Sequence, residues 1–388
     1  MTAADAPRSP APVGLREIAS ARALRTVFVL LAMWTLLALH PESRQSFLSA
    51  GNFSNLTAQV AELVIVGVGM TLVILIGGID LSVGSGMAVA GVIAAKLQMD
   101  MHQPAWVAVL AAVAVCGTLG AWHGFLITRF GIPPFIVTLS GLLSYRGIGL
   151  VISDARGLSP MGEDFQKLGG RLAPGTTLAI CAVGLALGVI AVMRRKARRA
   201  ALGLPSTGTL LLALKLGAIV LTAAFAAVIY QDGVPVPVVI AALAVAIGAL
   251  VLRRTRLGRY AFAIGGNSEA ARLSGVPVAK VTIALYLAIG VLTALAGMVA
   301  AARTNGVTPG NMGLTRELHV ITAVVIGGTS LTGGRGTMVG TLIGALIFGT
   351  LSNGMNMLGV NSNWQLIITG QILLGASMLD ALSSKKVA

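Results

Sequence analysis

The sequence is poor in charged and aromatic side chains. Only 11% of its 388 residues are Asp, Glu, Lys or Arg, whereas soluble domains carry about 25%. Aromatic residues make up 5% of the chain, which argues against large stacking platforms. The shortage of charge excludes an ordinary soluble domain.

Cysteines and catalytic motifs are also scarce. Cys116 and Cys181 both lie inside apolar runs, so we expect packed core residues rather than a disulfide or a metal pair. No Gly-x-x-x-x-Gly-Lys-Ser/Thr stretch occurs, which argues against ATP binding through a P-loop, and no His-Glu-x-x-His cluster is present. We therefore expect no covalent chemistry and no bound cofactor on this chain.

Long apolar runs dominate instead. The chain is 56% hydrophobic with a mean hydropathy of +0.88, and a bilayer core needs roughly 20 apolar residues per helix. This pattern predicts an all-α polytopic membrane protein. Its tenth run is short and Gly-rich, and a full span, a re-entrant segment and a half-length helix are all open for it. The predicted spans are 25–40, 58–77, 84–99, 105–128, 132–152, 176–193, 209–230, 235–252, 277–302, 317–331, 337–358 and 363–382.

The net charge of +15 predicts topology rather than nucleic-acid binding. Lys and Arg collect in the N-terminal tail and at 194–199, 253–259 and 383–386. Alternation through the predicted spans places all four on one side, which the positive-inside rule makes cytoplasmic. The predicted organisation is thus a cytoplasmic tail (1–24), a transmembrane region (25–382) and a second cytoplasmic tail (383–388).

The stretch "GGIDLSVGS" interrupts an apolar run. Irregular backbone survives at membrane depth only where protein buries it or where it lines a watery cavity. We interpret it as a helix break beside a translocation path, with a carboxylate that accepts hydrogen bonds from backbone N–H groups and a serine that caps a helix restarting near residue 86. The alternative is an ordinary turn at the cytoplasmic end of a span. The residues concerned are Gly77, Gly78, Asp80, Ser82, Gly84 and Ser85.

A second stretch resembles this one. "VILIGGIDLSVGSG" at 73–86 is similar to "VVIGGTSLTGGRG" at 324–336 when Gly77-Gly78 are aligned with Gly327-Gly328. Transporters are often built from repeats, and Gly-interrupted segments at corresponding places indicate the substrate path. We therefore add Gly327, Gly328 and Thr329 to the candidate break residues. The alternative is chance similarity in a Gly-rich chain.

The polar loop 253–276 contains a short predicted helix. Asn267 is a good N-cap, Glu269 lies in the first turn, and Arg272 follows three residues later. Gly275 fits the position after the helix. Such a helix either docks on a soluble partner or is a surface helix without one.

Ionisable residues within the spans are few. Glu62 lies in the first turns of the second span and has two interpretations. It lines an outer vestibule, or it is an interfacial carboxylate, and we favour the second. With Asp80 as the only other candidate, an ion-coupled secondary transporter is a poor match, and a simple channel would not need the capped helix.

Four stretches carry a family resemblance: "GGIDLSVGS", "PPFIVTLSGLLSYRG", "YAFAIGGNSEAARLSGV" and "VIGGTSLTGGRGTMVGTLIGALIFGTLSNGMNMLGV". They resemble the permease subunits of monosaccharide ABC importers, the ribose, arabinose and xylose group, from about residue 50 to 380. The resemblance implies about ten core spans and a cytoplasmic coupling helix that contacts an ATPase subunit. The coupling residues that match are Gly265, Gly266, Asn267, Glu269, Ala270, Arg272 and Gly275.

Within this group the chain is most similar to xylose permeases. An inserted hairpin at about 176–230, with a basic linker, resembles theirs, although Gly78 stands where the xylose type has Glu. The resemblance implies D-xylose import across a bacterial inner membrane; another pentose, a hexose, inositol or a nucleoside is the alternative. It also implies a periplasmic sugar-binding protein, a second permease copy, surrounding lipid, and a cytoplasmic ATPase that holds ATP and Mg.

Overall fold

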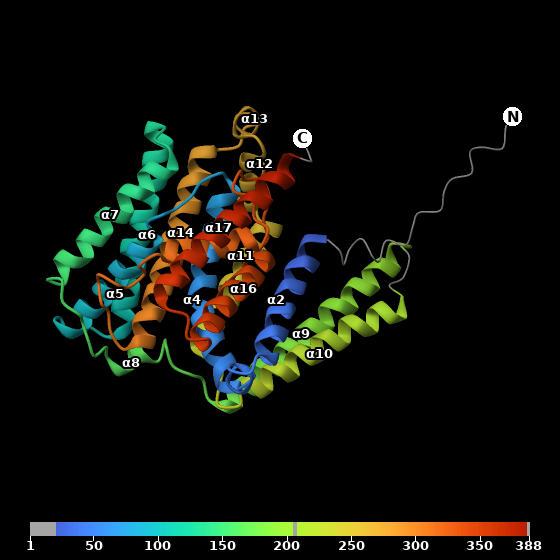
Figure 1. Cartoon of the computed structure of the whole chain (residues 1–388). Coiled ribbons are helices and arrows are strands. Elements are labelled where there is room, and N and C mark those ends of the chain that lie inside the picture. The colour runs from blue at the N-terminus through green and yellow to red at the C-terminus, as the bar shows by residue number, and fades with distance from the viewer. Residues whose placement is uncertain (1–20, 205–207, 386–388) are drawn as a thin grey trace.

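The computed structural model describes residues 21–204 and 208–385, and within them the regular structure is helical (Figure 1). Two isolated β-bridges, Leu158 with Val307 and Arg171 with Pro235, join loops. The helices are α2 (Ala21–Leu39), α3 (Arg44–Phe47), α4 (Ala50–Leu75), α5 (Val83–Met99), α6 (Ala105–Phe130), α7 (Pro134–Ile152), α8 (Glu163–Gln166), α9 (Pro174–Ala201), α10 (Thr209–Ile229), α11 (Val236–Arg254), α12 (Arg256–Gly266), α13 (Ser268–Leu273), α14 (Val278–Thr304), α15 (Arg316–Ile326), α16 (Met338–Met357) and α17 (Ser362–Lys385).

Each predicted apolar run corresponds to a helix, and the polytopic fold is confirmed. In the described part of the chain, nine helices are long and apolar enough to cross a membrane. α2 contributes a shorter apolar stretch, as does α5. α15 has only 11 residues, so the tenth run is half-length rather than a full span. α12 was not predicted.

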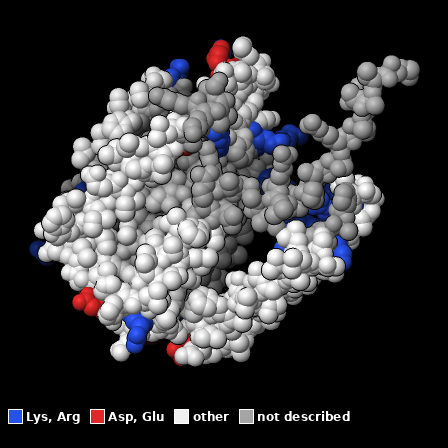
Figure 2. All heavy atoms as spheres, turned by 45° about the vertical axis from the view of Figure 1, so that its right-hand side comes forward, with Lys and Arg blue, Asp and Glu red and all other residues white. Residues whose placement is uncertain are grey.

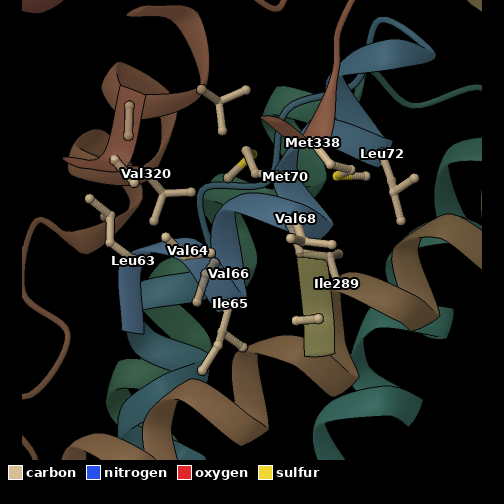
Figure 3. Packing of buried hydrophobic residues seen from close by; sticks show 14 of the residues in the cluster. Leu63, Val64, Ile65, Val66, Val68, Met70, Leu72, Ile289, Val320 and Met338 are labelled. Atoms are coloured by element: carbon tan, nitrogen blue, oxygen red, sulfur yellow. The ribbon is translucent and has the colours of Figure 1, made fainter. Parts of the chain in front are cut away.

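α4 is the central helix of the bundle. Every residue from Val60 to Leu75 is buried, and α4 packs against α11, α14, α15 and α16. Figure 3 shows Val64, Val68 and Met70 among side chains from three of its neighbours. Glycines allow this close packing, because a Cβ on Gly69 would meet the backbone of Ile289 on α14.

Glycines bring α6 and α14 into close contact. A Cβ on Gly120 would meet the carbonyl of Tyr286, and a Cβ on Gly290 would meet that of Cys116. Small residues allow helix backbones to approach closely in membranes. Both cysteines are free: Cys116 is buried, and Cys181 is partly exposed on α9.

α9 and α10 form the hairpin that was predicted as an insertion. They pack against each other beside α2, at the edge of the bundle (Figure 1). Phe225 of α10 contacts Trp34 of α2 and Phe53 of α4, with ring centroids 6.2 and 5.6 Å apart. Most of the hairpin surface is exposed and apolar, and the face shown in Figure 2 carries little charge across its middle. Such a surface suits contact with lipid.

The connections between the helices lie at two opposite ends of the molecule. α12 and α13 lie at one end, which we call the α13 end, together with the C-terminal end of α17 (Figure 1). The loop containing α8 and the α2–α4 connection lie at the opposite end, the α8 end. Most of the predicted tail 1–24 lies outside the described residues, and so does the end of the tail 383–388, while α17 continues to Lys385.

Candidate translocation and coupling site

The first break follows α4 directly. Gly77 has a φ of +78°, and the Gly78 amide donates to the carbonyl of Val73, which closes the end of the helix. The chain then runs back into the bundle without regular structure until α5 begins at Val83. The Ile79 carbonyl accepts hydrogen bonds from Thr138 Oγ1 (3.1 Å) and Tyr286 Oη (3.4 Å). From Gly78 to Ser82 the irregular backbone is therefore buried or partly buried against protein, as membrane depth requires, whereas Gly77 is exposed.

Asp80 fastens the break. Its side chain is buried, and Oδ1 accepts hydrogen bonds from the Ser82 amide (2.8 Å) and from Ser82 Oγ (2.6 Å). The hydrogen bond from the Ser82 backbone N–H to the Asp80 carboxylate agrees with the prediction from the sequence. The predicted caps are wrong, because Ser82 Oγ is directed to Asp80, whereas Ser85 Oγ donates to the Leu142 carbonyl at 2.7 Å. Neither serine caps α5, which begins three residues earlier than the expected restart.

Asp80 lies near the middle of the bundle rather than at its rim. It lines a cavity of about 20 Å³ with Tyr145 of α7 and Thr293 of α14. Thr293 is 15 residues after Val278, which is roughly 22 Å along a helix of about 40 Å. His123 of α6 is buried close by, with Nε2 2.7 Å from Tyr145 Oη. The ordinary-turn alternative therefore fails, since such a turn would expose the carboxylate.

The second break repeats the geometry of the first. Gly328 has a φ of +91°, and the Thr329 amide donates to Val324, five residues back, as Gly78 does to Val73. Gly77 thus corresponds to Gly328, so the alignment on glycine pairs is wrong by one residue. Gly327 instead packs against the carbonyl of Gly340 on α16. The shared turn supports a structural repeat.

A carboxylate also fastens the second break, but from another helix. Asp380 of α17 accepts hydrogen bonds at Oδ2 from Ser330 Oγ (2.9 Å) and the Leu331 amide (3.2 Å). The sequence alignment could not indicate it, because Asp380 lies about 50 residues further along the chain. Its position in the last apolar run was the available signal.

The predicted helix in the polar loop is present as α13. Asn267 Oδ1 accepts a hydrogen bond from the Ala270 amide at 2.9 Å, and Gly275 has a φ of +82°. Arg272 donates two hydrogen bonds to Glu269, at 3.0 and 2.6 Å. The Arg272 guanidinium lowers the pKa of Glu269, whose side chain is exposed and remains ionised near neutral pH. α13 is therefore a rigid, charged projection.

α12 connects α13 to both breaks. A Cβ on Gly265 would meet the Leu75 carbonyl at the end of α4 and the Gly334 amide of the second break. That same amide donates a 2.9 Å hydrogen bond to the Leu75 carbonyl. Gly266, its neighbour, faces open space. We call the contact of Gly265, Leu75 and Gly334 the break junction, and it brings together three predicted segments from distant parts of the chain.

A cavity of about 610 Å³ extends inward from the α8 end. It lies among α4, α14, α15, α16 and the loops at 157–159 and 306–314. On one side of its floor Gly313, with a φ of +68°, packs on the carbonyl of Gly84 in the first turn of α5. Arg146 of α7 holds this loop by donating to the carbonyls of Pro309 and Met312, each at 2.7 Å. This loop thus packs on the first turn of the helix that follows the first break.

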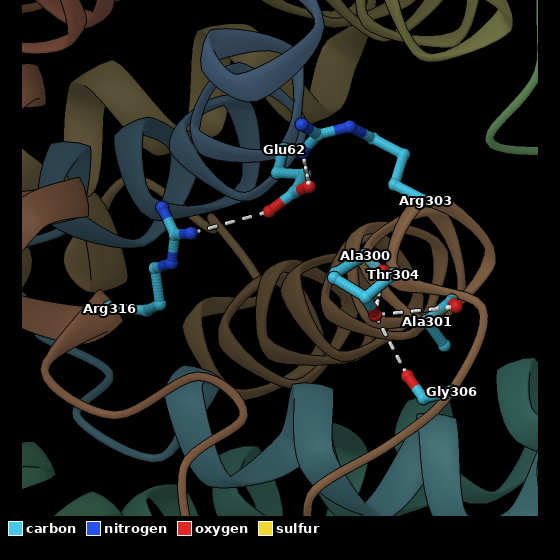
Figure 4. A network of polar contacts seen from close by, with 7 residues as sticks. All are labelled: Glu62, Ala300, Ala301, Arg303, Thr304, Gly306 and Arg316. Atoms are coloured by element: carbon cyan, nitrogen blue, oxygen red, sulfur yellow. Dashed lines mark hydrogen bonds and ion pairs between the residues drawn. The ribbon is translucent and has the colours of Figure 1, made fainter. Parts of the chain in front are cut away.

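Glu62 lies in the wall of this cavity. Its side chain is 4% exposed and pairs with Arg303 of α14 through Oε1 and with Arg316 of α15 through Oε2, the latter at 3.5 Å (Figure 4). The favoured interfacial interpretation of Glu62 is wrong, because an interfacial carboxylate would face solvent. The vestibule alternative agrees with the structure.

Sequence reasoning missed both arginines. They come from the ends of different helices and meet Glu62 only in the folded chain. One signal was present: Arg303 and Arg316 flank a Gly-, Pro- and Asn-bearing loop on the side where the positive-inside rule predicts few basic residues. The ion pairs with the buried Glu62 carboxylate explain why Arg303 and Arg316 occur on this side.

Long apolar helices around a polar cavity, with two helix breaks, define a multi-pass membrane transport protein. The chain belongs to the family described as the branched-chain amino acid transport system permease component, whose model matches residues 52–377. Members of this group are integral proteins of the bacterial inner membrane.

Three curated relatives cover most of the chain. The xylose transport system permease protein XylH of Escherichia coli is 38% identical over 88% of this chain and 87% of its own length. XylH of Haemophilus influenzae is 35% identical over 94% of this chain and 98% of its own length. The ribose import permease protein RbsC of Escherichia coli is 36% identical over 90% of this chain and 92% of its own length. No solved structure matches the chain.

Proposed function

We propose that this chain is the permease subunit of an ATP-driven importer for a monosaccharide. One observation carries the proposal: the capped, ion-paired helix α13 is joined to α12, and α12 packs on the junction of the two helix breaks. A protein that binds α13 can therefore act on the transmembrane path. The names of the xylose and ribose relatives support a sugar as the cargo.

D-xylose is the proposed sugar, with ribose as the nearest alternative. The inserted α9–α10 hairpin favours the xylose type, whereas the identities to xylose and ribose permeases, 38% and 36%, favour neither. Another pentose, a hexose, inositol or a nucleoside would use the same machinery.

The proposed orientation places the α13 end in the cytoplasm. There a partner ATPase, which binds ATP and Mg, would engage α13, and a periplasmic sugar-binding protein would deliver sugar at the α8 end. A second permease copy would complete the pathway. Nucleotide binding shifts the balance between outward- and inward-open states only if the ATPase contacts the two states differently.

The test uses the reconstituted complex of this chain with the ATPase and binding protein of its own transport system. ATP hydrolysis is measured while the binding protein is loaded in turn with D-xylose, D-ribose, D-glucose or L-leucine. Stimulation by a sugar, with D-xylose strongest, is expected. Stimulation by leucine alone would replace the sugar proposal with the amino-acid cargo that the family description names.

A further inference from the structure

The polar cavity at the α8 end contains a charged group that the coupling scheme does not use. Glu62 and its two arginines are remote from the break junction, which lies at the α13 end. We infer that this cavity is a binding site for the monosaccharide in the permease itself, with Glu62 as its central acceptor. The inference rests on the proposed function and names where the sugar binds.

The size of the cavity fits a small ligand. Its volume of about 610 Å³ lies within the ~300–1,000 Å³ typical of small-molecule sites. It reaches from Ser159 in the α7–α8 loop to Met87 of α5 and His319 of α15. A single sugar ring therefore has room to enter from the α8 end and to contact several helices.

Glu62 offers acceptor capacity that its ion pairs do not exhaust. An ionised carboxylate has about four lone-pair positions, and the two arginines occupy one on each oxygen. The remaining positions can accept hydrogen bonds from adjacent sugar hydroxyls. The buried carboxylate is held in place from both sides, so it is preorganised for such a ligand.

The arginines supply the complementary donors. The side chains of Arg303 and Arg316 are 23% and 38% exposed, and both line the cavity. Each guanidinium has five N–H donors in a rigid plane, and its bond to Glu62 uses few of them. Figure 4 shows the two groups approaching Glu62 from different helices. Acceptors and donors therefore alternate across one wall, which matches hydroxyls that both donate and accept.

Besides hydrogen-bond partners for its hydroxyls, a sugar ring needs an apolar surface for its C–H face. His319 and Phe348 line the same cavity, and their ring centroids lie 4.8 Å apart. Met87 also lines the cavity, so the cavity offers weakly polar side chains as well as charged ones.

The charges favour a neutral polyol over an amino acid. Among the described residues that line the cavity, Glu62 is the only carboxylate, while two are arginines. An α-ammonium group drawn to Glu62 would lie beside both guanidiniums, and an α-carboxylate would compete with Glu62 for them. A neutral sugar avoids both costs.

The test measures sugar binding by the purified full-length permease in nanodiscs, using saturation-transfer NMR titrations with D-xylose, D-ribose and L-leucine. Glu62→Ala and Arg316→Ala should raise the apparent Kd for D-xylose about tenfold or more, as expected for loss of a hydrogen bond to a charged group. Glu62→Gln should weaken binding less, and it decides the question should Glu62→Ala not fold. Glu163→Gln is the control, because Glu163 is an exposed carboxylate on α8 that does not line the cavity.

The outcomes separate this inference from the proposed function. Unchanged D-xylose binding in Glu62→Gln and Arg316→Ala would overturn the cavity assignment, and sugar-stimulated ATP hydrolysis in the complex would still support the importer. Transfer to leucine and not to sugars would overturn the ligand class. Failure of every sugar to stimulate the complex would instead refute the importer proposal itself.

Discussion

At the scale of single residues, each break is fastened by a carboxylate: Asp80 is buried inside the bundle, whereas Asp380 is partly exposed near the C-terminal end of α17. Asp80 and Asp380 each accept hydrogen bonds from a backbone amide and a serine hydroxyl. An ionisable side chain at membrane depth is costly unless it has such partners. Both groups therefore act as fasteners of irregular backbone.

Asp80→Ala tests this role. The substitution leaves the buried Ser82 amide without its acceptor, which costs about 1–3 kcal/mol. We expect a lower thermal unfolding temperature and impaired uptake, with assembly of the complex largely retained. Asp80→Asn keeps an acceptor oxygen and is the matched control. Wild-type uptake and stability in Asp80→Ala would show that the break holds without its carboxylate.

At the scale of elements, α13 and α12 form one unit. α13 is the charged helix that projects from the bundle, and α12 connects it to the two breaks. Glu269→Lys replaces the ion pair with two adjacent cations and places positive charge in the first turn, where a helix favours an anion. We expect normal membrane insertion but loss of ATP hydrolysis stimulated by the loaded binding protein. Normal stimulation in this variant would refute docking through α13.

The break junction gives a second test at this scale. Gly265→Ala places a methyl group against the Leu75 carbonyl and the Gly334 amide, whereas Gly266→Ala meets nothing within 4 Å. Uptake per ATP hydrolysed should fall in the first variant and stay near wild type in the second. Equal behaviour of the two alanine variants would argue that the junction transmits no movement.

The sequence predicted most elements but not their assembly. Apolar run length predicted the spanning helices, and capping chemistry predicted α13 from Asn267 to Gly275, because both signals are local. α12 was missed because it has only 11 residues, three of which are glycines, and follows directly after a basic stretch. Arg303 and Arg316 were missed because the partner they share, Glu62, lies about 240 residues away from Arg303. Such pairings depend on packing rather than on local pattern.

At the scale of the whole molecule, the bundle has a proposed inside and outside. In a variant with Cys116 and Cys181 replaced by alanine, Leu204→Cys lies at the α9–α10 tip and Glu163→Cys in α8; both positions are exposed. An impermeant thiol reagent added to intact cells with a permeabilised outer membrane should label the second cysteine and spare the first. The reverse pattern would invert the proposed orientation.

Transport itself tests the proposed importer function without any intermediate readout. Proteoliposomes containing this permease and its ATPase are given ATP on the α13 side and loaded binding protein on the α8 side, and radiolabelled D-xylose is followed. For an ATP-driven importer we expect uptake that requires ATP and the binding protein and that falls in Glu269→Lys. Uptake that persists without ATP and follows an ion gradient would contradict the proposed importer function.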